Sequence, residues 1–314
     1  MSKKKAAKYL WVEKFRPTSI SDAVLPNAFR NFFNDVVEEG QIPNLLLYSS
    51  TPGSGKTSMA KALCSEIGAD SLYINVSSES GIDTLRSTIK EFASTKSFNK
   101  RPKVVIMDEA DGASPQLQAG LRAFIEEFHA HCRFILTCNY ISKIIEPLRE
   151  GRIMEFDFNM NSAKLSKELK PKMVKRLLQI AKFEGVPAET SAIEALVENQ
   201  FPNMRKMISA MQKASKMYGA IDENIFSIVK VDSELYEFIL DKKFSKAREH
   251  VIQSSYNIDE LFPAFYRELV PMISDKSKQA QVILILAQYQ SMHGTAIDAE
   301  LNLSACLLEI IGSL

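Results

Sequence analysis

The fold is decided by the stretch Leu45-Leu-Leu-Tyr-Ser-Ser-Thr-Pro-Gly-Ser-Gly-Lys-Thr57. In it a short apolar run, Leu45 to Tyr48, leads into the glycine-rich loop Ser50 to Thr57, and a helical pattern begins at Ser58. The glycines of such a loop allow it to curl so that backbone N–H groups point inward, with the N-terminus of the helix behind them. The stretch therefore predicts the phosphate-binding turn between a strand and a helix of an α/β fold.

The loop also contains the side chains that a nucleoside triphosphate with magnesium requires. Lys56 can reach the β- and γ-phosphates, and the Thr57 hydroxyl suits Mg²⁺. Ser50 stands where the full pattern of such loops has glycine. A glycine-rich turn without a ligand is the alternative for this loop, but the Gly-Lys-Thr sequence between a strand and a helix favours the binding of ATP and Mg²⁺.

A second set of polar residues follows the apolar run Val104 to Met107. Asp108 would hold the magnesium through water, and Glu109 would orient or deprotonate an attacking water. Two acids after a strand usually form a solvated loop, but the upstream phosphate loop favours the catalytic interpretation. Asn139 ends the apolar run Phe134 to Cys138 and would point its amide at the γ-phosphate. A turn-forming asparagine is the alternative there.

Composition limits the classes of protein that fit. The 314 residues are 46% hydrophobic and 25% charged, which predicts a globular protein of two or three compact units and excludes wholesale disorder. The net charge of +1 provides no global basic field, so any contact with DNA must be local. No apolar run is long enough to cross a bilayer, and the four cysteines form no CxxC pair. We expect a cytoplasmic protein with no membrane partner, disulfide framework or zinc site.

The apolar pattern divides the chain into three parts. Up to residue 160, short apolar runs alternate with longer helical patterns, which is typical of a parallel sheet covered by helices on both faces. From residue 161 the strand pattern stops. Basic side chains outnumber acidic ones in residues 161–230, and acidic side chains outnumber basic ones in residues 231–314. We therefore expect an α/β domain at 1–160 and two helical domains, at 161–230 and 231–314.

The order of these motifs resembles that of the AAA+ ATPases: a phosphate loop, an Asp-Glu pair, a strand-end asparagine and then an all-helical lid. Four strings resemble clamp loaders in particular, namely Trp11-Val-Glu-Lys-Phe-Arg-Pro17, Asn75-Val-Ser-Ser-Glu-Ser-Gly-Ile-Asp83 with Arg86, Thr137-Cys-Asn-Tyr-Ile-Ser-Lys-Ile-Ile-Glu-Pro147, and Phe201-Pro-Asn-Met-Arg205-Lys. The chain is similar over essentially its whole length to replication factor C small subunits. Given its short length, it is more similar to the large clamp-loader subunits of T-even-type bacteriophages. The resemblance implies an AAA+ P-loop NTPase domain, a helical lid and a helical C-terminal collar.

The resemblance also implies roles for individual residues. The adenine pocket would be lined by Val12, Glu13, Lys14, Phe15 and Val24, although N-terminal packing is the alternative for this cluster. The phosphates would be wrapped by Gly53, Ser54, Gly55, Lys56, Thr57 and Ser58, and the nucleotide would be reached from the lid by Arg205, for which a surface position is the alternative. DNA would lie against Gly81, Ile82, Arg86 and Ser114. Subunit coupling would use Gln118 and Arg122, which share one face of a helix; a solvated face without such a role is the alternative.

The expected arginine finger departs from the pattern of the relatives. They place it in Ser-Arg-Cys, four residues after the proline that matches Pro147, whereas this chain has Pro147-Leu-Arg149-Glu-Gly-Arg152. The relatives also keep the finger six residues before an aromatic strand residue, and Arg152 stands in that relation to Phe158. We therefore predict Arg152 as the finger and keep Arg149 as the alternative.

Together these features predict an ATP-driven switch that acts in an oligomer. The γ-phosphate would be sensed in cis by Asn139 and Arg205 and in trans by a neighbour's Arg152, which favours a closed spiral that holds a sliding clamp open. The expected partners are the clamp, a clamp-loader small subunit, other copies of this chain in a pentameric spiral, and primer-template DNA. A helicase or branch-migration motor is the first alternative. It would normally carry a further DNA-binding domain after the lid, and the acidic, helical pattern of residues 231–314 speaks against one. An inactive scaffold would not need Lys56, Asp108 and Glu109.

Overall fold

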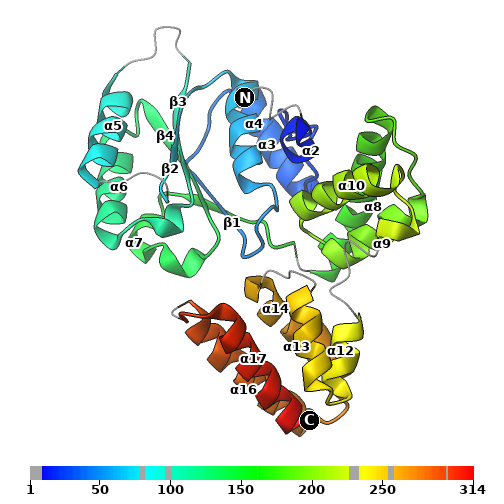
Figure 1. Ribbon diagram of the computed structural model, residues 1–314. Helices are drawn as coiled ribbons and strands as arrows, with labels where there is room; N and C mark the ends of the chain where they lie inside the picture. Colours follow the sequence, from blue (N-terminus) through cyan, green and yellow to red (C-terminus); the bar gives the residue numbers. More distant parts are fainter. Residues whose placement is uncertain are drawn as a thin grey trace. The chain divides into compact units, whose positions relative to one another are not determined.

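The computed structural model describes residues 9–77, 82–95, 101–160, 162–225, 233–253, 258–294 and 296–314 (Figure 1). The chain divides into two compact units, Met1–Val229 and Lys230–Leu314, which are described separately. The first unit keeps the predicted ranges 1–160 and 161–230 together, so the domain boundaries stay predictions.

A five-stranded parallel sheet forms the centre of the first unit. Its strands are β1 (Leu45–Tyr48), β2 (Asp70–Asn75), β3 (Lys103–Asp108), β4 (Cys132–Cys138) and β5 (Met154–Asp157), in the spatial order β2-β3-β4-β1-β5. The predicted parallel sheet is confirmed. Because β4 lies between β1 and β3, the loops that follow these three strands meet at one edge of the sheet.

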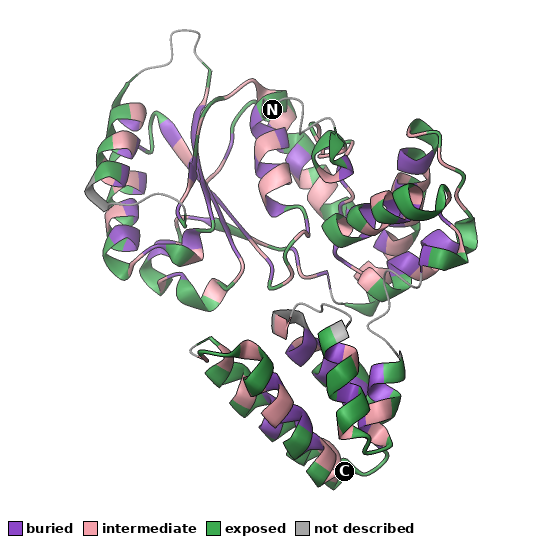
Figure 2. Ribbon diagram, viewed as in Figure 1, coloured by how far each residue is buried: buried purple, intermediate pink, exposed green. Residues whose placement is uncertain are grey.

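Helices cover both faces of this sheet. On one side lie α5 (Ile82–Ser94), α6 (Pro115–Glu127) and α7 (Glu146–Arg149), and on the other lie α3 (Asn27–Glu39) and α4 (Lys56–Ile67) (Figure 1). Alternate residues of one strand serve different cores: Leu46 packs in the first cluster, whereas Leu45 and Leu47 pack in the second. The three central strands β1, β3 and β4 are buried almost throughout (Figure 2), whereas the edge strands β2 and β5 are largely exposed. Burial on both faces explains why the central strands read as unbroken apolar runs.

Three further helices, called the lid helices below, complete the first unit: α8 (Ala163–Phe183), α9 (Thr190–Gln200) and α10 (Met204–Tyr218). The Ser162 side chain caps α8, and the Asn203 side chain caps α10. The core of the lid helices also includes Trp11, from the short N-terminal helix α2 (Trp11–Lys14). The N-terminal segment is therefore packed against the lid, although all five strands of the sheet lie between the two in the sequence.

In its described residues the second unit is entirely helical. Its elements are α12 (Ser233–Leu240), α13 (Phe244–Gln253), α14 (Ile258–Ala264), the π-helical turn η4 (Phe265–Leu269), α15 (Val270–Met272), α16 (Lys276–His293) and α17 (Ala299–Ser313). They share one hydrophobic core that includes Phe265, Leu286 and Leu307. The helical C-terminal region agrees with the predicted fold class. Among the described helices of the whole chain, none has the length and apolar character needed to span a membrane.

Candidate nucleotide-binding site

A cavity lies between the edge of the sheet where the strands end and the lid helices. Four groups of predicted residues line it: Val12, Phe15 and Val24 from the N-terminal segment; Gly53, Ser54, Gly55, Lys56, Thr57 and Ser58 from the phosphate loop; Asp108, Glu109 and Asn139 from the ends of β3 and β4; and Arg205 from α10. The structure thus brings together residues from both ends of the first unit. Apolar groups line one part of the cavity and phosphate-binding groups the other, which is the distribution that a nucleotide requires.

The phosphate loop has the backbone that its glycines predicted. Gly53 and Gly55 have φ angles of 78° and 98°, in the left-handed region that favours glycine, and α4 begins at the next residue, Lys56. A Cβ atom on Gly53 would lie 2.3 Å from Oδ1 of Asn203 and 2.8 Å from Cβ of Arg205. Gly53 is therefore required for two reasons, the curl of the loop and the close approach of the lid.

Two polar side chains of the loop suit an anionic ligand. The hydroxyl of Ser54 is buried without a hydrogen-bond partner in the described chain, and a phosphate oxygen could accept its hydrogen bond. Lys56 is buried, and its Nζ donates to the Ser49 carbonyl and to Oδ1 of Asn139, each at 3.1 Å. Burial lowers the pKa of Lys56, because a buried ammonium lacks its full hydration. An adjacent phosphate would restore charge compensation, so these residues fit a triphosphate.

Three hydroxyl groups hold the carboxylate of Asp108. Thr57 Oγ1 donates to Asp108 Oδ1 at 2.6 Å, Thr137 Oγ1 donates to the same oxygen, and the Tyr73 hydroxyl donates to Oδ2 at 2.6 Å. Burial acts to raise the pKa of Asp108, but these hydrogen bonds outweigh it and hold the pKa below its ordinary value. Asp108 is therefore ionised at neutral pH beside the Thr57 hydroxyl.

This arrangement fits Mg²⁺. Among the described residues no group of three or more His, Cys, Asp or Glu side chains could hold a metal ion by itself. Magnesium typically takes one or two protein oxygens and completes its shell with water and phosphate oxygens. Thr57 and Asp108 supply such protein oxygens at the phosphate loop.

The proposed catalytic base, Glu109, occupies an unusual backbone position. Glu109 has φ 57°, in the left-handed region, and its N–H donates to Thr137 Oγ1 at 3.3 Å. Strained backbone of this kind persists where surrounding contacts enforce it, and it is frequent at functional sites. The neighbouring end of β4 is held by Asp111, whose Oδ2 accepts from the N–H groups of Asn139 and Tyr140 at 3.2 and 3.1 Å. These contacts set the positions of both residues at the cavity.

Some residues of the site were not predicted from the sequence. Thr137 and Tyr73 position Asp108, and Arg176 of α8 lines the cavity. A threonine inside the apolar run Phe134 to Cys138 is a signal that could have been used, because a buried hydroxyl needs a partner. Nothing in the sequence distinguishes Arg176 from the other basic residues of the lid helices.

Two residues expected at the adenine pocket do not line the cavity. Lys14 Nζ forms an ion pair with Glu184 at 2.6 Å and lies 4.8 Å from the centre of the Phe183 ring. Glu13 forms an ion pair with Arg16 at 2.5 Å. Both residues join α2 to its surroundings, and their predicted roles in binding stay predictions.

The expected DNA-facing residues lie around the start of α5 and α6. Gly81 and the side chain of Ile82 lie outside the described residues, although α5 begins at Ile82. One guanidinium nitrogen of Arg86 donates to the Gln116 carbonyl at 3.2 Å, and the Ser114 hydroxyl caps α6 by accepting from the Leu117 N–H at 3.2 Å. These roles in DNA binding stay predictions.

The two expected coupling residues differ in their surroundings. Gln118 is buried, and its amide joins three backbone groups: it donates to the carbonyls of Ala113 and Lys143 and accepts from the Ile145 N–H, at 2.8 to 3.1 Å. A solvated position, the alternative for this face, is therefore wrong for Gln118. Arg122 is exposed and lies 3.5 Å from Glu126. Gln118 thus connects the loops that follow β3 and β4.

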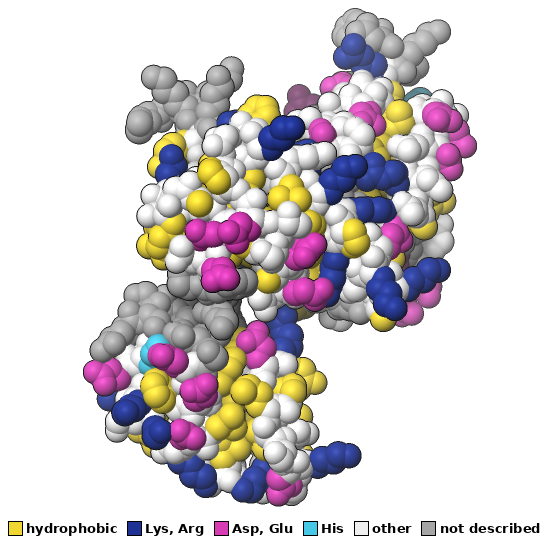
Figure 3. All heavy atoms as spheres, turned by 90° about the vertical axis from the view of Figure 1, so that its right-hand side faces the viewer, with side chains coloured by type: hydrophobic (Ala, Val, Ile, Leu, Met, Phe, Trp, Pro, Cys, Tyr) yellow, Lys and Arg dark blue, Asp and Glu magenta, His cyan; other side chains and the backbone are white. Residues whose placement is uncertain are grey.

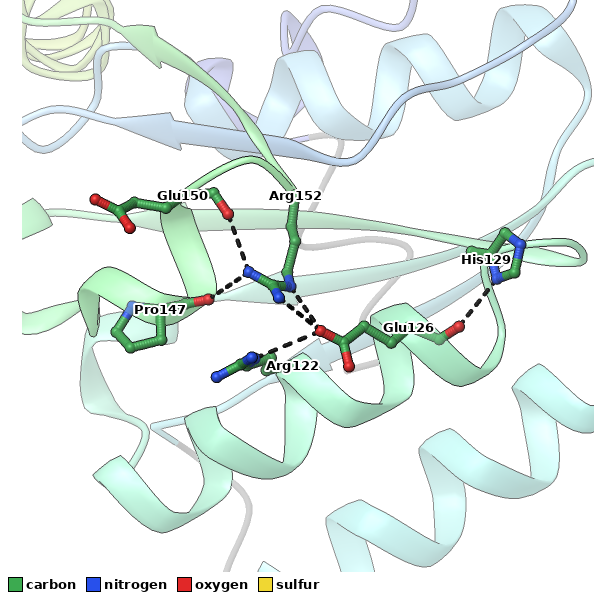
Figure 4. Close-up of polar contacts among 6 residues, drawn as sticks. All are labelled: Arg122, Glu126, His129, Pro147, Glu150 and Arg152. Atoms are coloured by element: carbon green, nitrogen blue, oxygen red, sulfur yellow. Dashed lines mark hydrogen bonds and ion pairs between the residues drawn. The ribbon is translucent and has the colours of Figure 1, made fainter.

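Neither candidate for the arginine finger lines the cavity of its own chain. Arg152 contacts Glu126 and the carbonyls of Pro147 and Glu150 (Figure 4). Arg149 forms a two-pronged pair with Glu155, at 2.7 and 3.2 Å. Both positions are compatible with a role toward a second subunit, and the choice between them stays a prediction.

Comparison with known proteins places the chain in a family. Residues 46–162 match the model of the ATPase family associated with various cellular activities (AAA), and residues 166–227 match that of the sliding-clamp-loader large subunit, AAA+ ATPase lid domain. The sliding-clamp-loader large subunit of Escherichia phage RB69 is 34% identical over 95% of this chain and 94% of its own length. Replication factor C small subunit 1 of Pyrobaculum islandicum is 33% identical over 97% of this chain and 94% of its own length.

A solved structure of the Thermotoga maritima RuvB Holliday junction branch migration motor superposes with a TM-score of 0.54, at 17% identity, and covers 72% of this chain and 78% of that one. At this identity the likeness shows the fold alone. The matches along nearly the full length of clamp-loader subunits are more informative, and with the geometry of the phosphate loop and the lid they show that this chain belongs to the clamp-loader family of AAA+ ATPases.

Proposed function

We propose that this chain is an ATPase subunit of a clamp loader, which uses the binding and hydrolysis of ATP to open a sliding clamp and load it onto primer-template DNA. The observation that carries the proposal is the contact between the phosphate loop and the lid, where Gly53 meets Asn203 and Arg205. A nucleotide bound in this cavity would touch both parts at once. Its phosphates can therefore control the position of the lid, as a switch requires.

The residues of the cavity divide the chemistry between them. Lys56 and the N–H groups of the loop bind the phosphates, and Mg²⁺ would neutralise the charge that develops on them. Thr57 and Asp108 would hold the metal, Asn139 would orient the γ-phosphate, and Glu109 would take a proton from the attacking water. In the described chain Lys56 Nζ donates a hydrogen bond to Asn139 Oδ1, which supports a shared role of both side chains at the γ-phosphate.

Other residues link this chemistry to partners. Gln118 joins the loop that follows Asp108 and Glu109 to the loop that follows Asn139. The loop after Asn139 leads toward Arg152. A change at the γ-phosphate can thus reach the surface that would meet a neighbouring subunit. Arg152 would complete the site of that neighbour, and α5 and α6 would bind the phosphates of DNA.

The second unit is suited to join subunits. Several large hydrophobic side chains on it are exposed, including Leu284, Leu301 and Leu308, and Figure 3 shows hydrophobic side chains side by side on one face of the unit. Large exposed apolar patches mark interaction sites. We expect this unit to form a collar with a small subunit and further copies of the chain in a pentameric spiral. The phage relatives favour the cytoplasm, of the host if the chain is phage-encoded.

Steady-state ATP hydrolysis by the assembled loader tests the proposal. We expect slow hydrolysis alone and strong stimulation when clamp and primer-template DNA are present together, with both lost in Lys56→Ala. Stimulation by branched DNA without any effect of the clamp would instead indicate a branch-migration motor. Absence of hydrolysis under all conditions would indicate a scaffold.

A further inference from the structure

Glu126, near the end of α6, accepts hydrogen bonds from Arg152 of the loop between α7 and β5 (Figure 4). Nε and one terminal nitrogen of the guanidinium lie 2.8 and 2.7 Å from the same oxygen, Oε1. The other terminal nitrogen donates to the carbonyls of Pro147 and Glu150, at 3.2 and 3.1 Å. All three nitrogens of Arg152 are therefore engaged within its own chain.

The edge of Arg152 that Glu126 occupies is the one that matters for an anion. Nε and a terminal nitrogen together form a flat edge that binds two oxygens of a carboxylate or phosphate. While Glu126 holds this edge, Arg152 cannot offer it to a phosphoryl group. The two carbonyls of the loop do not compete in this way, because they bind the opposite nitrogen.

Glu126 has a second partner within reach. Arg122 lies one helical turn earlier on α6, with its Nε 3.5 Å from the same Oε1 (Figure 4). The side chain of Glu126 is 52% exposed, and exposed ion pairs contribute little to stability and are screened by salt. The carboxylate can therefore exchange Arg152 for Arg122 without being left unpaired. Arg152 also holds the pKa of Glu126 below its ordinary value, so this carboxylate is charged at neutral pH.

We propose that Glu126 is a positioning residue that holds Arg152 back in a subunit without a neighbour and releases it to the γ-phosphate of a nucleotide on the adjacent subunit. On release Glu126 turns to Arg122, and the carbonyls of Pro147 and Glu150 keep the guanidinium in place. This inference rests on the proposed function and on Arg152 as the finger. It assigns to the pair Glu126 and Arg122 the suppression of hydrolysis before the spiral has closed.

The variant Glu126→Gln removes the charge but keeps the size of the side chain. In the assembled loader we expect hydrolysis without DNA to rise about 2- to 5-fold, the range that a surface ion pair supports. We expect kcat with clamp and DNA to stay within about 2-fold of the wild type, because Arg152 is then already released. The matched control is Glu127→Gln, the next residue of α6, which is also exposed and should change neither rate.

Two further measurements separate this role from a merely structural one. The double variant Glu126→Gln with Arg152→Ala should hydrolyse ATP no faster than Arg152→Ala alone, since the gain acts through Arg152. In the isolated full-length chain, nuclear magnetic resonance of the Arg152 Nε–H should show faster exchange with water in Glu126→Gln than in the wild type.

The outcomes distinguish the inference from the proposed function. An unchanged rate without DNA, or a fall in the stimulated kcat with Glu126→Gln, would overturn the inference while leaving a clamp-loading ATPase intact. Unchanged exchange of the Nε–H would also overturn it. A wild-type loader that does not respond to clamp and DNA would instead count against the proposed function, whatever the exchange measurement shows.

Discussion

The two units of the chain bury different kinds of side chain. The described part of the first unit buries polar or charged residues, namely Ser49, Ser54, Lys56, Lys103, Asp108, Gln118, Thr137 and Asn203. In the second unit, over residues 233–253, 258–294 and 296–314, the buried side chains are all hydrophobic. Burying a polar group is unfavourable unless it finds a partner. Within the described chain all of these side chains except Ser54 have hydrogen-bond partners, and most of them lie at or beside the cavity.

The second unit, whose buried side chains are hydrophobic, also exposes large hydrophobic side chains on its surface. The second unit exposes large hydrophobic residues on α16 and α17, among them Leu284 at 70% and Leu301 at 68%. A helical bundle with an apolar interior gains nothing from such residues on its own surface. This difference agrees with the proposal that the interior of the first unit carries the chemistry and the surface of the second unit joins subunits. Four predictions test this division.

The largest expected effect concerns Glu109. Replacing it by Gln should leave ATP binding intact and reduce kcat by about 10²- to 10⁴-fold, because an amide cannot accept the proton of the attacking water. Single-turnover hydrolysis and equilibrium binding of a fluorescent ATP analogue measure the two effects. Glu127→Gln serves as the control. Near-normal turnover of Glu109→Gln would remove Glu109 from the catalytic role and weaken the assignment of chemistry to this cavity.

The next effect concerns the second unit as a whole. Truncation after Lys230 should leave a folded monomer that binds ATP. The stimulation of its ATP hydrolysis by clamp and DNA should fall by at least roughly 10-fold, because Arg152 no longer meets a neighbour's site. Sedimentation measures the assembly, and ATP hydrolysis measures the response. The milder pair Leu284→Ser and Leu301→Ser should weaken assembly without lowering the melting temperature, since both side chains are exposed. A truncated chain that still assembled would transfer this role to the basic lid helices.

A smaller effect is expected at the proposed DNA-facing surface of the first unit. Arg86→Ala should weaken binding of primer-template DNA by roughly 5-fold, about equally for all sequences, and lower the salt slope by about one. Fluorescence anisotropy over a series of salt concentrations measures both quantities. Lys164→Ala, an exposed substitution on α8, is the control. A loss that depended on the DNA sequence would mean that Arg86 reads bases.

The smallest effect concerns stability. Because burial lowers the pKa of Lys56, its charged form is disfavoured in the folded chain, and this cost is present below the folded pKa. Lys56→Met should therefore raise the melting temperature without ATP by about 2 °C at neutral pH. The gain should shrink as the pH rises toward the ordinary value of 10.5. Calorimetry measures it, with Lys213→Met as the exposed control.

ATP should reverse the order of stability in the same experiment. Ligand that binds only the folded chain stabilises it, so saturating ATP should raise the melting temperature of the wild type and leave that of Lys56→Met unchanged. A variant that was less stable than the wild type at every pH would show that the hydrogen bonds of Lys56 to Ser49 and Asn139 outweigh the cost of its burial.

The sequence by itself determined the local parts of this protein. Apolar runs predicted the strands, since buried parallel strands are apolar on both faces, and the glycines at 53 and 55 predicted the curl of the phosphate loop. The strings around Trp11, Asn139 and Arg205 were enough to indicate the family, which the comparisons confirmed. Each of these inferences depends on neighbours in the chain or on a short, fixed spacing.

Only the tertiary structure decided which distant residues meet. The backbone N–H of Trp11 donates to Oε1 of Gln212, 201 positions away, which helps to pack the N-terminal segment against the lid. Thr137 and Tyr73 meet Asp108 because their strands are parallel and close in the sheet, and Glu126 meets Arg152 because α6 ends beside the loop before β5. Such contacts follow from the packing of whole elements. The hydrophobic pattern of one helix or strand does not predict where another one lies. For this reason the sequence indicated the proposed catalytic groups, whereas their positioning partners came from the fold.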